Sequence, residues 1–235
     1  MTSPARPPSQ ASPAELLADA ARRAVRYLDS LDRRPVAPPA DAVARLAALD
    51  VPMPATSTDA AQVLAQLDGI VGPATMAMAG PRFFGFVIGG ALPATVAANW
   101  LATAWDQNAA LATATPGVSR VEAVALTWLN SLFGLPPSTQ GAFVTGATMA
   151  NFTALAAARH DVLARAGWSV EADGLFGAPP ITVLVGEEAH PTLIKSLGLL
   201  GLGRKRVVRV PVDGQGRLRA DRLPRIAGPT ILCLQ

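Results

Sequence analysis

Residues 141–159 read GAFVTGATMANFTALAAAR, and the turn within this stretch decides the fold. A short apolar run at 141–145 predicts a β-strand, and a helical pattern from about 147 to 165 begins directly after Gly146. In an open α/β sheet such a turn lies at the carboxyl edge, where ligands gather. The helix would point unpaired N–H groups and the positive end of its dipole at this edge, which suits a phosphate. The alternative is an ordinary tight turn that needs a glycine.

Apolar strands alternate with helices through the rest of the C-terminal half. We expect strands at 181–186, 206–212 and 229–235, and helices near 191–200 and 220–227. This rhythm predicts the α/β class, with a mostly parallel sheet covered by helices.

The N-terminal half has a helical texture. We expect helices at 13–31, 41–49, 57–71, 92–107 and 118–134, with an extended stretch at 81–90. The first of these opens with a capping box, Ser12-Pro13-Ala14-Glu15. The first three helices are rich in alanine and poor in large apolar residues, so we expect them to lie against something larger.

Composition excludes several classes of protein. Half of the 235 residues are hydrophobic and the formal net charge is +3, which indicates a globular chain. The basic residues are scattered, which argues against nucleic-acid binding. The uncharged segment 83–105 is interrupted by glycines and a proline, so we expect no membrane span. Cys233, the only cysteine, forms no internal disulfide, and no signal peptide is visible, so we expect a cytoplasmic protein.

His190 is the second candidate site residue. It follows the expected strand 181–186 and would therefore lie at the same sheet edge as Gly146. A cap or loop role is the alternative. Without further ligands at suitable spacing, we expect no metal site.

Five stretches carry a resemblance to a known family: PRFFGFVIGG, WDQN, TPGVSRVE, FVTGATMANFTALAAAR and EEAHPTLIKSLGLLGLG. In this order and spacing they resemble the group II pyridoxal-phosphate-dependent decarboxylases, the family of aromatic amino acid and glutamate decarboxylases. The resemblance covers roughly residues 15–235. It implies a PLP-dependent transferase fold of type I, a pyridoxal 5′-phosphate (PLP) cofactor and a homodimer.

The resemblance also implies a division of the chain. Residues 1–12 would be a disordered N-terminus and 13–107 a helical segment that wraps around the partner subunit. Residues 108–235 would be the first part of the PLP-binding large domain, which would be incomplete.

Site residues follow from the resemblance by position. His190 would be the catalytic residue that stacks on the pyridine ring. The cofactor-binding residues would be Gly146, Ala147, Thr148, Met149, His190 and Asn108, and the substrate pocket would include Phe86, Ile88 and Gly89. We expect Asn151, Arg159 and Glu122, which also match family positions, to support the fold.

The implied reaction is the decarboxylation of an amino acid by a carbon–carbon lyase. It requires a lysine that binds the cofactor covalently and an aspartate that pairs with the pyridine nitrogen. Neither has a match in this sequence, and Lys195 matches a family position other than that lysine. We therefore expect this chain to be an inactive fragment of an intact enzyme.

Two alternatives stay open. The intact protein would be another enzyme of the same fold, such as an aminotransferase or a desulfurase, or a truncated subunit that only dimerises. Phe86 and Ile88 are apolar where aromatic decarboxylases often carry tyrosine and proline. The substrate is therefore not identified beyond an amino acid.

Overall fold

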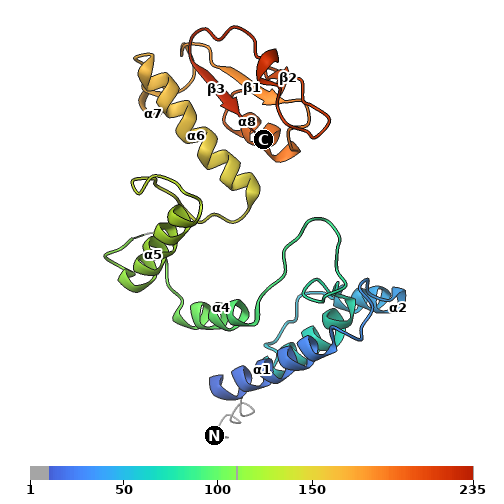
Figure 1. Cartoon of the computed structure of the whole chain (residues 1–235). Coiled ribbons are helices and arrows are strands. Elements are labelled where there is room, and N and C mark those ends of the chain that lie inside the picture. The colour runs from blue at the N-terminus through green and yellow to red at the C-terminus, as the bar shows by residue number, and fades with distance from the viewer. Residues whose placement is uncertain (1–10, 110, 235) are drawn as a thin grey trace, which may run out of the picture. The chain divides into compact units, whose positions relative to one another are not determined.

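The computed structural model describes residues 11–109 and 111–234 (Figure 1). Along the chain, the boundary between two compact units falls between Gln107 and Asn108. Each unit is described by itself. The prediction of disorder for residues 1–12 falls mostly outside the described residues, although Ser12 has a defined role as a helix cap.

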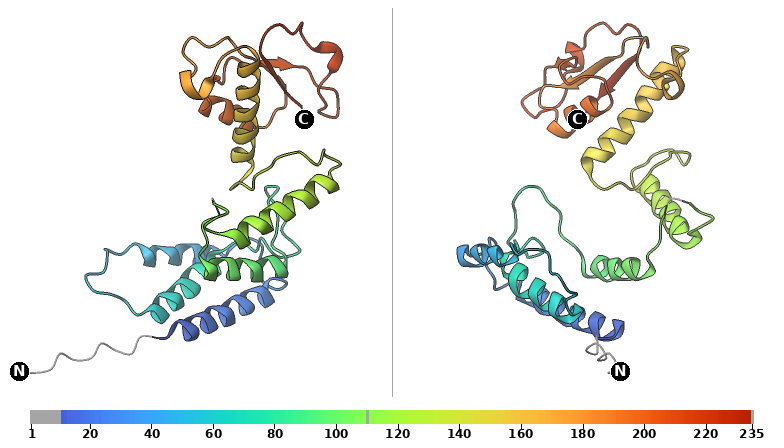
Figure 2. Two further views of the ribbon diagram at one scale, coloured as in Figure 1. Left: turned by 90° about the vertical axis from the view of Figure 1, so that its left-hand side faces the viewer. Right: turned by 180° about the vertical axis from the view of Figure 1, so that it is seen from behind.

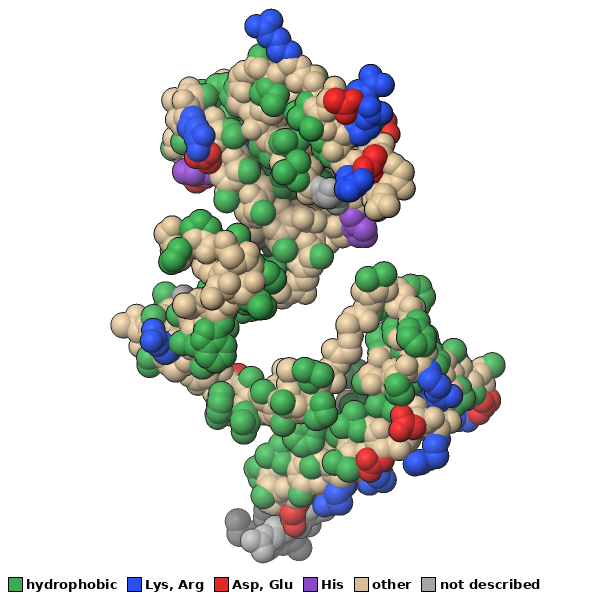
Figure 3. All heavy atoms as spheres, in the orientation of Figure 1, with side chains coloured by type: hydrophobic (Ala, Val, Ile, Leu, Met, Phe, Trp, Pro, Cys, Tyr) green, Lys and Arg blue, Asp and Glu red, His purple; other side chains and the backbone are tan. Residues whose placement is uncertain are grey.

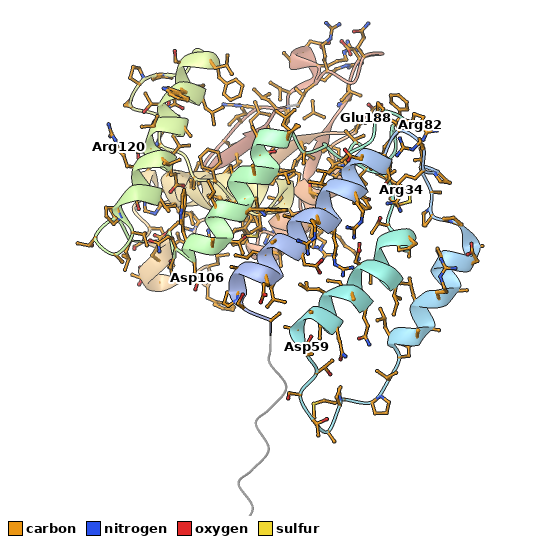
Figure 4. The ribbon with its side chains drawn as sticks, turned by 90° about the horizontal axis from the view of Figure 1, so that it is seen from below. Arg34, Asp59, Arg82, Asp106, Arg120 and Glu188 are labelled. Atoms are coloured by element: carbon orange, nitrogen blue, oxygen red, sulfur yellow. The ribbon has the colours of Figure 1, made fainter. Side chains whose placement is uncertain are left out.

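The first unit is helical, as predicted. Its α-helices are α1 (Pro13–Ser30), α2 (Ala40–Ala44), α3 (Ala60–Gln66) and α4 (Pro93–Trp105), with short helical turns η1 (Arg45–Leu49), η2 (Leu67–Val71) and η3 (Gly72–Ala74). The capping box of α1 is present: Glu15 N–H donates to Ser12 Oγ at 3.3 Å, and Ser12 N–H donates to Glu15 Oε2 at 2.7 Å. Asp59 caps α3 through bonds to two backbone amides, and Figure 4 labels it at the start of that helix.

Polar contacts fasten the helices of the first unit. Arg23 of α1 donates to Asp68 Oδ2 at 2.9 Å. Arg34 donates to the carbonyl oxygens of Gly72 at 2.9 Å and Thr75 at 3.4 Å, and its guanidinium lies 4.6 Å from the centre of the Tyr27 ring. These contacts tie the segments around residue 70 to α1 and to the loop that follows it.

The expectation of an extended stretch at 81–90 is wrong. Residues 81–82 and 86–87 form turns, no strand is present between them, and Phe86 and Val87 have φ angles of 59° and 52°. Left-handed backbone is unfavourable for residues with a Cβ, above all for a β-branched one, so no pattern of residue types predicts it here. Among the described residues, none of the helices combines the length and the apolar character needed to cross a bilayer.

The second unit contains the predicted parallel sheet. The strands are β1 (Thr182–Gly186), β2 (Val208–Val210) and β3 (Thr230–Cys233), in the order β2-β1-β3 with both pairings parallel. Leu184 is paired with Val208 on one side and with Leu232 on the other. The helices are α5 (Pro116–Leu132), α6 (Ala147–Arg165), α7 (Val170–Asp173) and α8 (Pro191–Leu199), with a turn η4 (Ala220–Arg222).

The core of the second unit lies between β1 and two helices. Side chains alternate along a strand, so Val183 and Val185 share one face of β1. They pack with Leu155 of α6 and with Leu193 and Leu197 of α8. Figure 2 shows α6 lying along the small sheet in both views. Leu184, on the opposite face of β1, is also fully buried.

Two sequence expectations for the second unit need correction, and one helix was missed. Residues 141–144 have no regular structure, because a strand requires a hydrogen-bonded neighbour and none of the described strands pairs with them. The helix expected at 220–227 is only the turn η4. The short helix α7 was not predicted.

Candidate functional site

The site is built around the first turn of α6. Gly146 is the N-cap, and it provides no side chain to accept from the amides of the helix. The first hydrogen bond of the helix runs from the Ala150 N–H to the carbonyl oxygen of Gly146, at 3.0 Å. Within the described part of the chain, the N–H groups of Ala147, Thr148 and Met149 have no acceptor. Three backbone donors and the positive end of a 19-residue helix therefore converge at one exposed turn.

The surroundings of this turn favour an anion. Its first turn contains no acidic residue that would compete for the amides. Gly146 has a φ of 162°, an extended conformation that any residue adopts, and a Cβ built there would meet no described atom within 4 Å. The need for a tight turn therefore does not explain the glycine at position 146. The missing side chain instead leaves the amides open to a ligand.

His190 caps the neighbouring helix. It directly precedes α8, and its ring Nδ1 accepts from the backbone N–H of Thr192 at 3.2 Å. Nδ1 also lies 2.8 Å from Thr192 Oγ1. His190 thus has the cap role that the sequence left open, through one edge of its ring, and the residue is otherwise exposed.

Hydrogen bonds between side chains bring His190 and the first turn of α6 together. Asn151 Nδ2 donates to Thr192 Oγ1 at 3.1 Å, which connects α6 to the residue that contacts His190. Ser196 Oγ donates to the carbonyl oxygen of Thr148 at 3.0 Å and to that of Thr192 at 2.9 Å. The side chain of Ser196 is fully buried. The two halves of the predicted site are therefore linked by contacts between α6 and α8.

Sequence reasoning missed Thr192 and Ser196. Polar residues at these spacings on a helix are typical of a solvated face, so their residue types alone do not mark Thr192 and Ser196 as contacts between helices. Ser196 lies three residues after the buried Leu193, so the two side chains are neighbours on the surface of α8. That position was the available hint.

The remaining predicted site residues lie in other segments of the chain. Asn108 opens the second unit, and its carbonyl oxygen accepts from the Thr115 hydroxyl at 2.7 Å. Phe86, Ile88 and Gly89 lie in the first unit, where Phe86 is 81% exposed and Ile88 48% exposed. The structure therefore links Gly146–Met149 and His190 through the contacts of α6 with α8, within the second unit, whereas Phe86, Ile88 and Gly89 belong to the first unit.

The three residues expected to support the fold make contacts between segments. Arg159 Nη1 donates to Leu200 O at 3.1 Å, which joins α6 to the end of α8. Glu122 Oε1 accepts from Phe143 N–H at 3.5 Å, and Asn151 makes the bond to Thr192 described above.

Two hollows flank α8. One, of about 290 Å³, is lined by α6, α8 and β3 and includes Asn151 and Cys233. Burial raises the pKa of the Cys233 thiol, which keeps it protonated and unreactive. The other, of about 500 Å³, is lined by Pro191, Lys195 and Arg209, among others. Lys195 is exposed on α8.

Comparison with known proteins finds a decarboxylase family model and relatives that are decarboxylases. Residues 43–227 match the family described as the pyridoxal-dependent decarboxylase conserved domain. An aromatic-L-amino-acid decarboxylase of Bacillus atrophaeus is 28% identical over 145 residues, which cover 62% of this chain and 28% of the relative. An L-2,4-diaminobutyrate decarboxylase of Acinetobacter baumannii is 28% identical over 138 residues, 55% of this chain and 26% of that protein.

A solved structure shares the fold. The TDC of Oryza sativa, determined with PLP and tryptamine, superposes with a TM-score of 0.77 at 23% identity, over 92% of this chain and 45% of that one. The expected type I fold of PLP-dependent enzymes is confirmed. The present chain spans less than half the length of each of these proteins.

Proposed function

Because this chain belongs to the pyridoxal-dependent decarboxylase family, we propose that the whole protein is a PLP-dependent amino acid decarboxylase, a carbon–carbon lyase. One observation carries this proposal in the described residues. The open first turn of α6 is fastened to α8, the helix that His190 caps, by the bonds of Ser196 and Asn151.

The first turn of α6 fits the phosphate of the cofactor. Three unpaired N–H groups, at Ala147, Thr148 and Met149, match the acceptor oxygens of a phosphate dianion. The Thr148 hydroxyl offers a further donor. These residues hold the cofactor without contributing a charged side chain of their own.

His190 presents its ring to the same region. The Nδ1 edge is tied to α8, so the ring is held while its faces are not covered by the cap. A flat imidazole in this position stacks on the heteroaromatic ring of the cofactor and keeps water from that face. Asn108 lines the cofactor cleft in the proposed assembly.

The chemistry of bond cleavage belongs to the cofactor, which withdraws the electrons left when the carboxylate departs. The residues of this chain bind and orient it. We do not assign Lys195 to covalent attachment, because it is exposed on α8 beside Arg204 and Arg209, away from the capped end of the helix. The lysine and aspartate that the reaction needs are supplied elsewhere in the whole protein.

The substrate is an amino acid whose side chain meets the loop of Phe86, Ile88 and Gly89. Phe86 and Ile88 offer apolar surface, and both are exposed in the first unit by itself. The two relatives described above act on an aromatic and on a basic amino acid, so the family alone does not select the substrate.

We further propose a homodimer in which the helices of residues 13–107 wrap around the partner subunit. Large apolar side chains are exposed along α4, within residues 13–107, and also along α5 of the second unit, and hydrophobic side chains are spread over both helices in Figure 3. They include Trp100, Leu101, Trp105, Val121, Trp128 and Leu132. Neither helix contains a buried residue, so both present an apolar surface that a partner subunit would cover. Sedimentation of the whole protein would give the mass of a dimer, and a monomer at micromolar concentration would contradict this.

A cytoplasmic location is supported by Cys233, a free cysteine in a half-buried position. Fractionation of cells that express the whole protein tests it.

Ala147→Asp in the whole protein tests the cofactor site. The new carboxylate would occupy the amides and repel phosphate, so we expect binding of PLP to weaken at least tenfold in a spectroscopic titration, as for the loss of one or more charge-assisted hydrogen bonds. Ala157→Asp, on an exposed turn of α6 farther along the helix, is the matched control. Equal affinity in both variants would contradict the assignment. Release of carbon dioxide from a panel of amino acids then tests the reaction, and transfer of the amino group instead would favour an aminotransferase.

A further inference from the structure

Thr192 stands between α6 and the ring of His190. Its hydroxyl oxygen lies 3.1 Å from Asn151 Nδ2 and 2.8 Å from His190 Nδ1, and its backbone N–H lies 3.2 Å from the same Nδ1. We propose that Thr192, supported by Asn151, is a positioning residue that fixes the tautomer and the orientation of the His190 ring. This inference rests on the role of His190 in the proposed function.

The direction of each bond follows from the donors available. A backbone N–H only donates, so His190 Nδ1 accepts from Thr192 and carries no proton. The amide nitrogen of Asn151 also only donates, so Thr192 Oγ1 accepts from it. The hydroxyl hydrogen of Thr192 is then free to point at Nδ1. The neutral ring therefore holds its proton on Nε2, on the side away from the helix cap.

Ser196 adds a second connection between Thr192, in the first turn of α8, and α6. Its buried hydroxyl contacts Thr192 O at 2.9 Å and Thr148 O at 3.0 Å. Thr192 is thus connected to α6 twice, through Asn151 and through Ser196. Because Thr148 belongs to the proposed phosphate site, the same contacts fix the ring relative to the amides.

A purely structural role predicts something different. Thr192 and Asn151 are half-buried, and a valine at 192 would keep the shape of threonine while removing only the hydroxyl. If Thr192 only filled space, the tautomer of His190 would not respond to this change. If it positions the ring, the tautomer would respond without loss of the fold.

The first experiment reads the tautomer directly. The whole protein, without added cofactor, is labelled with 15N-histidine, and the His190 signals are assigned by their loss in His190→Gln. We expect an unprotonated Nδ1 and a protonated Nε2 in the parent protein and in Thr192→Ser. In Thr192→Val only the backbone N–H still donates to Nδ1, and in Asn151→Leu the hydroxyl is no longer held in place, so in both variants we expect the preference to weaken to a mixture with some protonated Nδ1. Thr153→Val, an exposed position on α6, is the matched control. The parent tautomer in all variants would overturn the inference.

The second experiment measures cofactor affinity by titration with PLP. We expect Thr192→Val to raise the dissociation constant about threefold to tenfold, the effect of losing one hydrogen bond, and Thr192→Ser to restore it. The two proposals fail separately. Tautomer changes without any binding of PLP would overturn the proposed function and leave the positioning of the ring intact. Tight binding of PLP that is indifferent to Thr192→Val, with an unchanged tautomer, would overturn the positioning and leave the function.

Discussion

Among the described residues, the first unit buries only Leu31, Ala42 and Ala77, whereas the second buries a continuous apolar cluster around β1. In the first unit the long-range contacts come largely from arginines, such as Arg34 to the carbonyl oxygens near residue 72 and Arg82 to Arg34 O at 2.6 Å. Figure 4 labels Arg34 and Arg82 at one end of this unit. The second unit is held by packing, and the first by hydrogen bonds at its surface.

This difference matters for function. A site that must hold two groups within a fraction of an ångström requires a rigid support, and the packed face of α8 provides it through Leu193 and Leu197. A helical segment that depends on polar contacts has little stability of its own and is completed by docking. The proposed roles of cofactor binding and subunit wrapping follow this division.

The largest effect is expected in the packed region. Leu197 is fully buried in α8, so Leu197→Ala would lower the free energy of unfolding of the whole protein by about 2–5 kcal/mol. Leu199, two residues later and 59% exposed, provides the control Leu199→Ala. Urea unfolding followed by circular dichroism measures both. Similar losses in the two variants would remove the basis of the comparison.

The next effect concerns the arginine contacts of the first unit. Arg34→Lys keeps the charge but loses the guanidinium Nη2 that reaches both Gly72 O and Thr75 O, which would cost about 1–2 kcal/mol. Hydrogen exchange of the amides in residues 67–77 would speed up. Arg33→Lys, at the exposed neighbouring position, should leave exchange unchanged. Unchanged exchange in Arg34→Lys would mean that packing, not these bonds, holds the unit.

A smaller effect is expected at the start of α1. Ser12→Ala removes the acceptor for Glu15 N–H, and the loss of such a cap costs about 1 kcal/mol. Exchange would rise in the first turn of α1 only. Ser57→Ala, at an exposed position that caps no helix, is the control. A rise along the whole of α1 would indicate that the capping box holds the entire helix.

The smallest effect is a dependence on pH in the same helix. The pKa of Asp19 is lowered from its ordinary value of 3.8, chiefly by the hydrogen bond from Arg23 and also by the charges of Arg23 and Arg22. A lowered carboxylate pKa stabilises the folded state above pH 4, and this contribution is lost as the pH falls from about 4 through the folded value. The protection factors of the α1 amides, which correct for the intrinsic pH dependence of exchange, should therefore fall between pH 5 and 3 more in the parent than in Asp19→Asn. Asp32→Asn, an exposed position without a side-chain ion pair among the described residues, should keep the full dependence. The same acid response in Asp19→Asn as in the parent would show that another group is responsible.

Local signals in the sequence were sufficient for most elements. The capping box at Ser12, the prolines that begin α4 and α8 and the glycine after α5 mark helix ends by their own chemistry. The runs that became β1, β2 and β3 predicted strands by their residue types, and their alternation with helices predicted parallel pairing.

The failures required information that no local pattern contains. Residues 141–145 have the composition of a strand, but strand formation depends on a neighbour, and the described residues provide none. Phe86 and Val87 adopt backbone angles that oppose their residue types. Gly146 and His190 were found from their positions after apolar runs, whereas the contact between Thr192 and Asn151 joins residues 41 positions apart and emerges only from packing.

The hydroxyl of Ser196 has a single hydrogen atom and two acceptors, one on each side. One proton shared between the carbonyl oxygens of Thr148 and Thr192 therefore links the opening turns of two helices through a single buried group. Without this hydroxyl, both carbonyl oxygens would lose the donor at once, so the two turns would loosen together and not one by one.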